Sequence, residues 1–203
     1  MSSSIQQDKQ TATATAAGLQ QGAFSVDASG QASYRIKILT PPGIAGLRPE
    51  LELVYNHRQS NSTLGVGWGL SGLSAITRTK ATYAQDGFNG VVDYSSKDRY
   101  VLDGQRLINI QGEYGGAGTV YNTELQSWKM IRAGASPEAG FTVITKNGQV
   151  WKYGTTPDSC IRAAGTDYVR VWALHSVEDT NGNRMEYHYT LTPVAGALPS
   201  GAY

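Results

Sequence analysis

The strongest structural signal in this chain is a two-residue alternation of apolar and polar side chains, interrupted repeatedly by glycine. In residues 33–39, the apolar Tyr34, Ile36 and Ile38 alternate with basic residues, and residues 50–55 show the same pattern. Successive side chains of a β-strand point to opposite faces of a sheet, so this period is typical of half-buried strands. No long segment with a helical period competes with it. The sequence therefore predicts an all-β fold of short, mostly antiparallel strands and hairpins.

Glycine usage supports the same fold class. The chain has 24 glycines among its 203 residues, well above the roughly 7% of average usage. They are spread along the chain, as many short strands joined by turns require. Residues 64–73 contain four glycines between large apolar residues, and each would cost a helix about 1 kcal/mol relative to alanine. We therefore expect a close-packed, irregular crossing in this stretch, with Trp68 buried.

Two β-hairpins are indicated by their turn residues. Asn147-Gly148 lies between two β-prone runs and favours a two-residue type I′ turn, because both residues tolerate the positive φ that this turn needs. That turn places Ile144 opposite Trp151. A second turn at residues 179–183 leads into a return strand whose side chains alternate cleanly between the two faces.

Charge and composition argue against several kinds of partner. The net charge is +1 and the pI is about 7.8, and no basic run could neutralise several phosphates, so nucleic acid is not expected as a partner. Membrane insertion is not expected either, because there is no basic amphipathic helix and no run of roughly 20 apolar residues. The single cysteine, Cys160, excludes an internal disulfide and is expected to be a partly buried structural thiol.

The expected organisation has three parts. Residues 1–21 form a flexible leader, residues 22–192 form the β domain, and residues 193–203 form a linker or a truncated continuation. The leader is rich in Ser, Thr, Ala and Gln, a composition of low hydrophobicity that favours disorder. It lacks the basic start and apolar core of a standard signal peptide.

Several sequence blocks, in order along the chain, carry a family resemblance. They are PPGIAGLRP from Pro41, GVGWGLSGLSAITR from Gly65, DRYVLDGQRL from Asp98, YNTE from Tyr121, VRVWAL from Val169 and DTNGN from Asp179. Together they resemble the N-terminal SpvB/TcdB-type domain of RHS-associated toxins, which include SpvB virulence proteins and the B components of Tc toxin complexes. The signature positions of this resemblance are Pro42, Gly43, Gly67, Trp68, Asp103, Gly104, Trp172, Asp179, Gly182 and Asn183.

The resemblance implies that the function of this region is architectural. In that family the region helps to build a β-sheet shell around a toxic cargo, and the toxic activity lies elsewhere in the chain. By this resemblance the chain is a non-catalytic structural segment of a secreted bacterial toxin, with no cofactor. Its partners would be the remaining RHS or toxin chain, the cargo and a subunit of a toxin complex. The parent protein would be assembled in the bacterial cytoplasm and would act outside the cell.

Two other functions are kept as alternatives. An ADP-ribosyltransferase would use an E-x-E pair such as Glu50 and Glu52, with residues 60–63 as a faint match to an S-T-S element. That element should precede the glutamates, and the alternation places both carboxylates on the solvent-facing side of their strand. A free-standing carbohydrate- or protein-binding module would instead use exposed aromatic side chains. The candidates are Trp68, Trp128, Trp151, Trp172, Tyr187 and Tyr189. Packing in the core and on the sheet faces explains them better.

The spacing of the polar residues along the sequence does not indicate a metal site, a phosphate-binding loop or a catalytic triad. The possible ligands are His57, His175, His188, Asp93, Asp98 and Asp103. The histidines lack metal-ligand spacing, and the aspartates lack the pattern of a calcium loop and are better explained as turn residues. Residues 112–118 are glycine-rich but lack the Lys-Ser/Thr ending of a phosphate-binding loop, so we expect a hairpin tip there. No G-x-S-x-G elbow raises the odds of a Ser/His/Asp triad.

Overall fold

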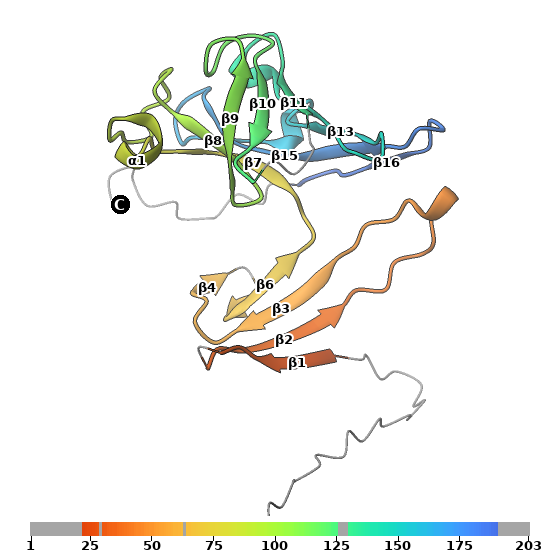
Figure 1. Cartoon of the computed structure of the whole chain (residues 1–203). Helices are drawn as coiled ribbons and strands as arrows, with labels where there is room; N and C mark the ends of the chain where they lie inside the picture. The colour runs from red at the N-terminus through yellow and green to blue at the C-terminus, as the bar shows by residue number, and fades with distance from the viewer. Residues whose placement is uncertain (1–21, 29, 63, 126–129, 191–203) are drawn as a thin grey trace, which may run out of the picture. The chain divides into compact units, whose positions relative to one another are not determined.

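The computed structural model describes residues 22–28, 30–62, 64–125 and 130–190, and these residues form two compact units (Figure 1). The small unit comprises the described part of Met1–Leu39 together with Glu50–Ser71. The large unit comprises Thr40–Pro49 and the described part of Gly72–Tyr203. Nearly all regular elements are antiparallel strands, so the predicted fold class is confirmed. The expected leader, residues 1–21, and the expected linker, residues 193–203, lie outside the described residues.

The small unit is built on one antiparallel sheet. Its strands, in spatial order, are β1 (Gly22–Val26), β2 (Ala32–Lys37), β3 (Glu52–Asn56) and β6 (Trp68–Ser71). The register places Tyr34 opposite Tyr55, and Tyr55 opposite Trp68. Since directly opposed residues share a face, most large apolar residues of the four strands gather on one side, whereas Val54 lies opposite Arg35 on the other. The alternation predicted for β2 and β3 is confirmed.

The glycine-rich stretch of the small unit forms strands, which corrects the prediction of an irregular crossing. Two short strands, β4 (Asn61–Ser62) and β5 (Gly65–Val66), pair with each other, and β6 follows directly. Gly67 has a φ of 78° and separates β5 from β6. A Cβ atom there would lie 2.6 Å from the ring of Tyr55. Trp68 is half-buried instead of buried, and its ring centre lies 5.4 Å from that of Tyr55 on the same face of the sheet.

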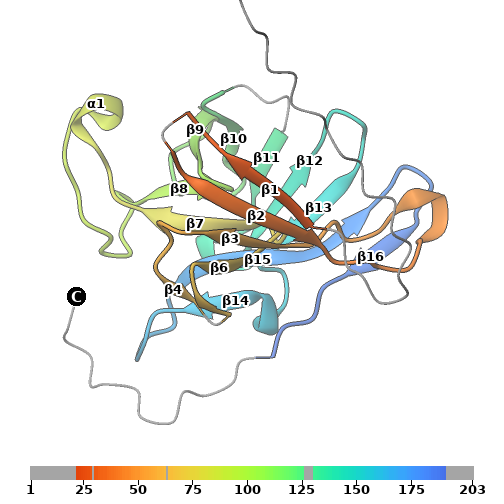
Figure 2. The ribbon, with the colours of Figure 1, turned by 90° about the horizontal axis from the view of Figure 1, so that it is seen from below.

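The large unit contains a sheet that closes on itself. Its strands are β7 (Ala75–Thr79), β8 (Arg99–Leu102), β9 (Gln105–Gln111), β10 (Val120–Thr123), β11 (Met130–Ala133), β12 (Phe141–Ile144), β13 (Val150–Tyr153), β14 (Cys160–Arg162), β15 (Val169–Glu178) and β16 (Arg184–Glu186). Strands β7 to β13 pair in sequence order, and Figure 2 shows β9 to β13 following one another around the unit.

Strand β15 closes this sheet because it is long enough to pair along both of its halves. It has ten residues; its first half pairs with β7 and β14, and its second half pairs with β13 and β16. Eight strands, β7 to β13 and β15, therefore form one closed sheet. Closure leaves these eight strands without a free edge, whereas β1 lies at an outer edge of the small sheet.

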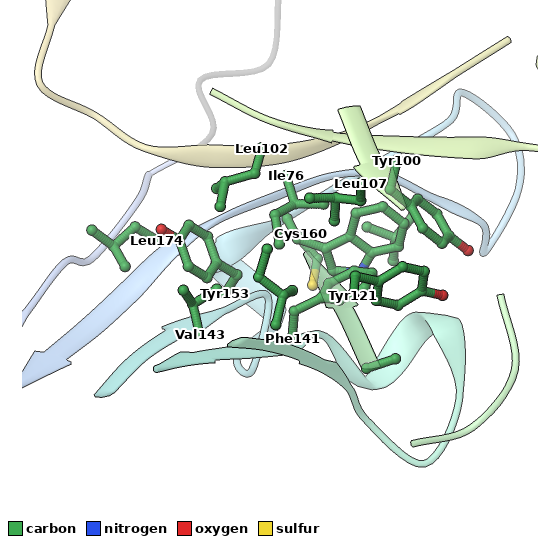
Figure 3. Close-up of a cluster of buried hydrophobic side chains, with 14 of the residues drawn as sticks. Ile76, Tyr100, Leu102, Leu107, Tyr121, Phe141, Val143, Tyr153, Cys160 and Leu174 are labelled. Carbon is green, nitrogen blue, oxygen red and sulfur yellow. The ribbon is translucent and has the colours of Figure 1, made fainter. Parts of the chain in front are cut away.

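Aromatic and branched side chains fill the closed sheet. Eight strands enclose an interior just wide enough for side chains, and Figure 3 shows this cluster. Trp172 and Phe141 meet edge to face with ring centroids 5.1 Å apart, and Tyr100 packs against both. The other buried members are Ile76, Leu102, Leu107, Tyr121, Ile131, Ala133, Val143, Tyr153, Cys160, Val169, Leu174 and Val177.

The first predicted hairpin exists, but its predicted register is wrong by one residue. Val143, and not Ile144, lies opposite Trp151. Gly148 has a φ of 81°, whereas Asn147 is not among the residues with positive φ. The loop is closed one residue earlier, by the N–H of Thr145 donating to the carbonyl of Gln149 at 3.0 Å. A type I turn ending in a left-handed glycine therefore replaces the two-residue turn.

The second hairpin is confirmed. Strand β15 turns at residues 179–183 into β16, and the side chains after residue 184 alternate between exposed and half-buried. The helices are single turns: α1 (Tyr83–Asp86) and the 3-10 turns η1 (Ile44–Gly46), η2 (Pro137–Ala139) and η3 (Pro157–Ser159). Within the described residues, no helix has the length and apolar character needed to cross a membrane.

Candidate functional site

The Asp103-Gly104 signature pair forms the turn between β8 and β9. Both residues have positive φ, 49° and 81°, as a two-residue type I′ turn requires. The carboxylate of Asp103 accepts a hydrogen bond from the hydroxyl of Ser74 at 2.6 Å and another from the N–H of Ala75 at 3.0 Å. Ser74 also contacts the hydroxyl of Tyr153 at 2.8 Å, and burial raises the pKa of Tyr153. This turn thus fastens the start of β7 to the core.

Two signature residues of the 179–183 turn, Asp179 and Asn183, are hydrogen-bonded to each other. Asp179 accepts hydrogen bonds from the N–H groups of Asn181 and Asn183, both at 2.9 Å, and from the side-chain amide of Asn183 at 2.8 Å. The Asn183 amide, followed by these backbone donors, lowers the pKa of Asp179. Gly182 has a φ of 81°. These bonds hold the turn that sets the register between β15 and β16.

Trp172 lies at the centre of the large unit. Its side chain is fully buried, and its indole N–H has no hydrogen-bond partner among the described residues. Of the remaining signature residues, Trp68 begins β6 and Gly67 precedes it, whereas Pro42 and Gly43 lie in a loop. Pro42 and Gly43 precede η1, and a Cβ atom at Gly43 would overlap the carbonyl oxygen of Leu47. Leu47 in turn packs against the core of the large unit.

Arg78 forms a buried cationic centre that the sequence analysis missed as a site. Its guanidinium donates to the carbonyl of Val169 at 2.8 Å and pairs with Asp98 at 3.2 Å, and Glu138 lies 3.6 Å away. Only 3% of the Arg78 side chain and 0% of the Asp98 side chain are exposed. The sequence did contain a signal for this site. Arg78 follows Ile76 by two residues, so in a strand its side chain must point inward with that of Ile76.

The surroundings of Arg78 are aromatic. Its guanidinium carbon lies 5.3 Å from the ring centre of Trp172 and 5.6 Å from those of Tyr94 and Tyr100. Such contacts stabilise a cation that has lost its water. Asp98 is satisfied on its other side by the N–H groups of Asp93 and Tyr94, at 3.1 and 2.9 Å. This Arg78 centre, Arg78 with Asp98 and Glu138, joins β7, the loop before β8, η2 and the start of β15.

A second ionic cluster lies around α1. Asp86, only 8% exposed, accepts from Arg99 at 2.6 Å, from the N–H of Thr82 at 2.8 Å and from Arg106. Burial alone would raise the pKa of Asp86, but the Thr82 N–H and the two guanidiniums together hold it below its ordinary value. The Arg99 guanidinium also lies over the Tyr114 ring, 4.4 Å from its centre.

The residues considered for catalysis are not gathered into one site. Glu52 lies in β3 and pairs with Arg35 at 3.4 Å, while Glu50 is exposed ahead of the strand. In the S-T-S-like stretch, the Ser62 hydroxyl donates to the carbonyl of Trp68, and Thr63 lies outside the described residues. Among the described residues, Glu52 is held by Arg35 and Ser62 by the carbonyl of Trp68, so the two are not paired with each other.

The candidate metal ligands are also dispersed. Within the described ranges, no group of three or more His, Cys, Asp or Glu side chains is placed to hold a metal. His57 contacts the N–H of Ala32 at 3.1 Å. His175 is buried beside Thr156, and its ring lies 6.2 Å from that of His188. Asp93 and Asp98 hold one loop, while Asp103 belongs to the other turn described above.

The aromatic candidates do not form one exposed platform. Trp172 is enclosed, and Trp151 is half-buried with its indole N–H donating to the Gln149 side chain at 3.1 Å. Tyr187 and Tyr189 are half-buried, and the Tyr189 hydroxyl donates to the carbonyl of Leu174 at 2.7 Å. Trp128 lies outside the described residues.

The glycine-rich stretch 112–118 and Cys160 are the remaining candidates from the sequence. The 112–118 stretch connects β9 to β10 as a hairpin tip, as predicted. Cys160 is buried, its thiol lies 3.3 Å from the carbonyl of Gly154, and burial raises its pKa. These surroundings agree with a structural role for the thiol.

Comparison with solved structures shows the same fold in toxin proteins. TcdB2-TccC3 matches with a TM-score of 0.66 and 21% identity over 89% of this chain and 9% of that one. The Photorhabdus luminescens Tc holotoxin pore gives 0.67 and 20%, again over 89% and 9%. The N-terminal domain of the effector SpvB from Salmonella typhimurium strain LT2 gives 0.60 and 18%, over 78% and 54%. This chain therefore spans only part of the length of these structures.

Comparison with protein families identifies the chain more directly. No curated protein sequence matches. The family model described as "SpvB: Salmonella virulence plasmid 65kDa B protein" matches residues 26–132, which is more than half of the 203 residues. The matched range contains Gly67, Trp68, Asp103 and Gly104, together with both members of the Arg78–Asp98 pair. The chain belongs to the SpvB family of Salmonella virulence plasmid 65kDa B proteins.

Proposed function

We propose that this chain is a non-catalytic structural segment of a secreted bacterial toxin, where it contributes β-sheet to a shell that encloses and delivers a C-terminal toxic cargo. The observation that carries the proposal is how the signature residues are used. Asp103 and Asp179 hold turns, and Trp172 fills the interior of the closed sheet. Their functional groups are directed at the chain itself, as a wall element requires.

The partners follow from the same proposal. They are the remaining RHS or toxin chain, the enclosed cargo and a partner subunit of a toxin complex. Support comes from the fold shared with TcdB2-TccC3 and with the Tc holotoxin pore. The match covers 9% of each of those longer chains. We expect no contact with nucleic acid and no membrane insertion by this segment. The parent would be assembled in the bacterial cytoplasm before it is secreted.

The two alternative functions have less support. An ADP-ribosyltransferase would need an accessible pair of glutamates beside a serine-threonine element, whereas Glu52 is engaged by Arg35. A carbohydrate-binding module would need an exposed aromatic surface, whereas Trp172 is enclosed and Trp68 packs on Tyr55. Neither alternative is favoured by a particular arrangement of the described residues.

Protease protection of the cargo tests the proposal. The native reading frame should continue for many hundreds of residues past Tyr203, and the encoded parent should keep its C-terminal part resistant to protease. Arg78→Met in the parent should expose that part, because it loosens the large unit, whereas the surface variant Arg35→Met should not. Cargo that is equally protected without residues 22–190 would contradict the shell role.

The non-catalytic part of the proposal has its own test. The chain should transfer no label from NAD to protein acceptors, and Glu52→Ala should change nothing. NAD-dependent labelling that is lost in Glu52→Ala would instead establish the transferase alternative.

A further inference from the structure

Strand β1 forms an outer edge of the small sheet and, as the described residues show it, has no charge, proline or bulge. It pairs with β2 on one side, and no described strand pairs with its other side. Natural edge strands are protected by charged residues, proline or bulges. The five residues of β1, GAFSV, are uncharged and exposed, lack proline, and pair with β2 in an unbroken register. As far as the structure describes the chain, this edge has room for another strand.

The direction of the backbone groups along β1 can be derived from the register. The N–H of Asp27 donates to the carbonyl of Gln31 at 3.1 Å, in the register that continues through β1 and β2. Hydrogen-bonded and non-hydrogen-bonded pairs alternate along an antiparallel ladder. The N–H groups of Ala23 and Ser25 therefore point toward β2. The N–H and C=O groups of Phe24, and of its second neighbours Gly22 and Val26, point outward.

The same residues lie on the apolar face of the sheet. Phe24 lies opposite Tyr34, which lies opposite Tyr55. Phe24 and Val26 are 69% and 55% exposed, although both are large and apolar. A strand added at this edge would extend the apolar face and bury part of both side chains.

We propose that a second copy of this chain pairs with this edge, β1 against β1, antiparallel about a two-fold axis at Phe24. Phe24 of each copy would then exchange both backbone hydrogen bonds with Phe24 of the other, and Gly22 would do so with Val26. These are the residues whose backbone groups point outward. A two-fold axis perpendicular to the sheet keeps both apolar faces on the same side.

The properties of β1 favour a second copy over a different partner. The strand is uncharged, so two copies meet without the like-charge repulsion that opposes direct cross-strand pairs. It also offers no charge with which to select a charged peptide. Phe24 would face Phe24 of the second copy, and aromatic cross-strand pairs are favourable. The contact is isologous, so it closes at two copies and leaves no β1 edge free.

Sedimentation of the full chain over a range of concentrations tests the proposal. The mass should rise from 21.8 kDa toward twice that value as the concentration increases. Phe24→Pro should weaken the dimer at least about tenfold, because it removes an outward N–H and leaves the bonds from Ala23 and Ser25 to β2. The control Ile110→Lys, at an exposed apolar residue of the large unit, should leave the dimer unchanged.

A charge exchange at Phe24 tests the register and does not depend on proline being tolerated. Phe24→Lys and Phe24→Glu should each be monomeric, because like charges would face each other at the two-fold axis. An equimolar mixture of the two variants should recover a dimer. In the wild type, amide exchange at Phe24 and Val26 should slow as concentration rises, whereas exchange at Ala23 and Ser25 should not change. A chain that stays monomeric at high concentration, a dimer that survives Phe24→Lys, or a mixture that stays monomeric would overturn the proposal.

Discussion

The guanidinium of Arg78 lies 3.2 Å from the carboxylate of Asp98, and both side chains are enclosed in the large unit. A charge removed from water is tolerated only when it is paired and hydrogen-bonded. Arg78 meets this condition with the Val169 carbonyl, and Asp98 meets it with two backbone N–H groups. Because the four segments joined at this pair are distant in sequence, the pair ties the closed sheet to its loops.

Removing either partner of this buried pair should therefore destabilise the chain strongly. Arg78→Met leaves Asp98 buried without its cation, and we expect a loss of about 3–5 kcal/mol in the free energy of unfolding. The double variant Arg78→Met/Asp98→Asn should lose less than the sum of the two single variants. Urea denaturation measures both. Arg35→Met, which removes an exposed pair, should cost at most about 1 kcal/mol; an equal loss in both arginine variants would contradict the special role of Arg78.

The corrected register of the 145–149 hairpin makes its own prediction. Gly148→Ala should destabilise by about 1 kcal/mol or more, since Gly148 has a φ of 81° and the added Cβ would lie 2.7 Å from a methyl carbon of Thr180. Asn147→Gly should destabilise by about 0.4–1 kcal/mol, because Asn147 does not need positive φ and glycine adds freedom to the unfolded chain. Thermal unfolding of the two variants decides the matter. A clear stabilisation by Asn147→Gly would point back to the two-residue type I′ turn.

Acid should destabilise the α1 region through Asp86. The pKa of Asp86 is lower in the folded chain than its ordinary value of 3.8, so the ionised form favours folding. Its contribution is complete above pH 3.8 and is lost as pH falls through the lower, folded-state pKa. Asp86→Asn should reduce stability at neutral pH and flatten the acid side of the profile. The matched control is Glu186→Gln, at an exposed pair with Arg184, and it should leave the acid side steep.

Alkali should destabilise the chain through its buried tyrosines. Burial raises the pKa of Tyr100 and of Tyr189 to about 12, from an ordinary value of 10.0. The neutral phenol therefore favours folding; its contribution is complete below pH 10 and is lost as pH rises toward 12. A tyrosinate absorbance titration should show some of the 12 tyrosines ionising only when the near-UV circular dichroism collapses. Ionisation of every tyrosine with tertiary structure retained would disprove this.

Local sequence chemistry was sufficient to predict the fold class, several of the strands and the positions of two hairpins. Alternation along residues 33–39 and 50–55 predicted β2 and β3 with the correct faces, because side-chain direction in a strand depends only on parity. Asp103-Gly104 and residues 179–183 were recognised from a family resemblance, and their positive φ values explain why glycine is needed there. The Asn147-Gly148 register was missed because two loop types compete for the same dipeptide, and the Thr145–Gln149 hydrogen bond favours the longer one.

What only the tertiary structure decided concerns residues that are distant in sequence. The alternation alone contains no information that β15 would pair with both β7 and β13 and so close the sheet, since pairing partners depend on contacts across the whole chain. The inward position of Arg78 followed from parity, but its partners Asp98, Glu138 and Val169 come from three other segments. Strand identity is a local property of the chain, whereas sheet closure and the enclosure of a charge require long-range packing that a local pattern does not specify.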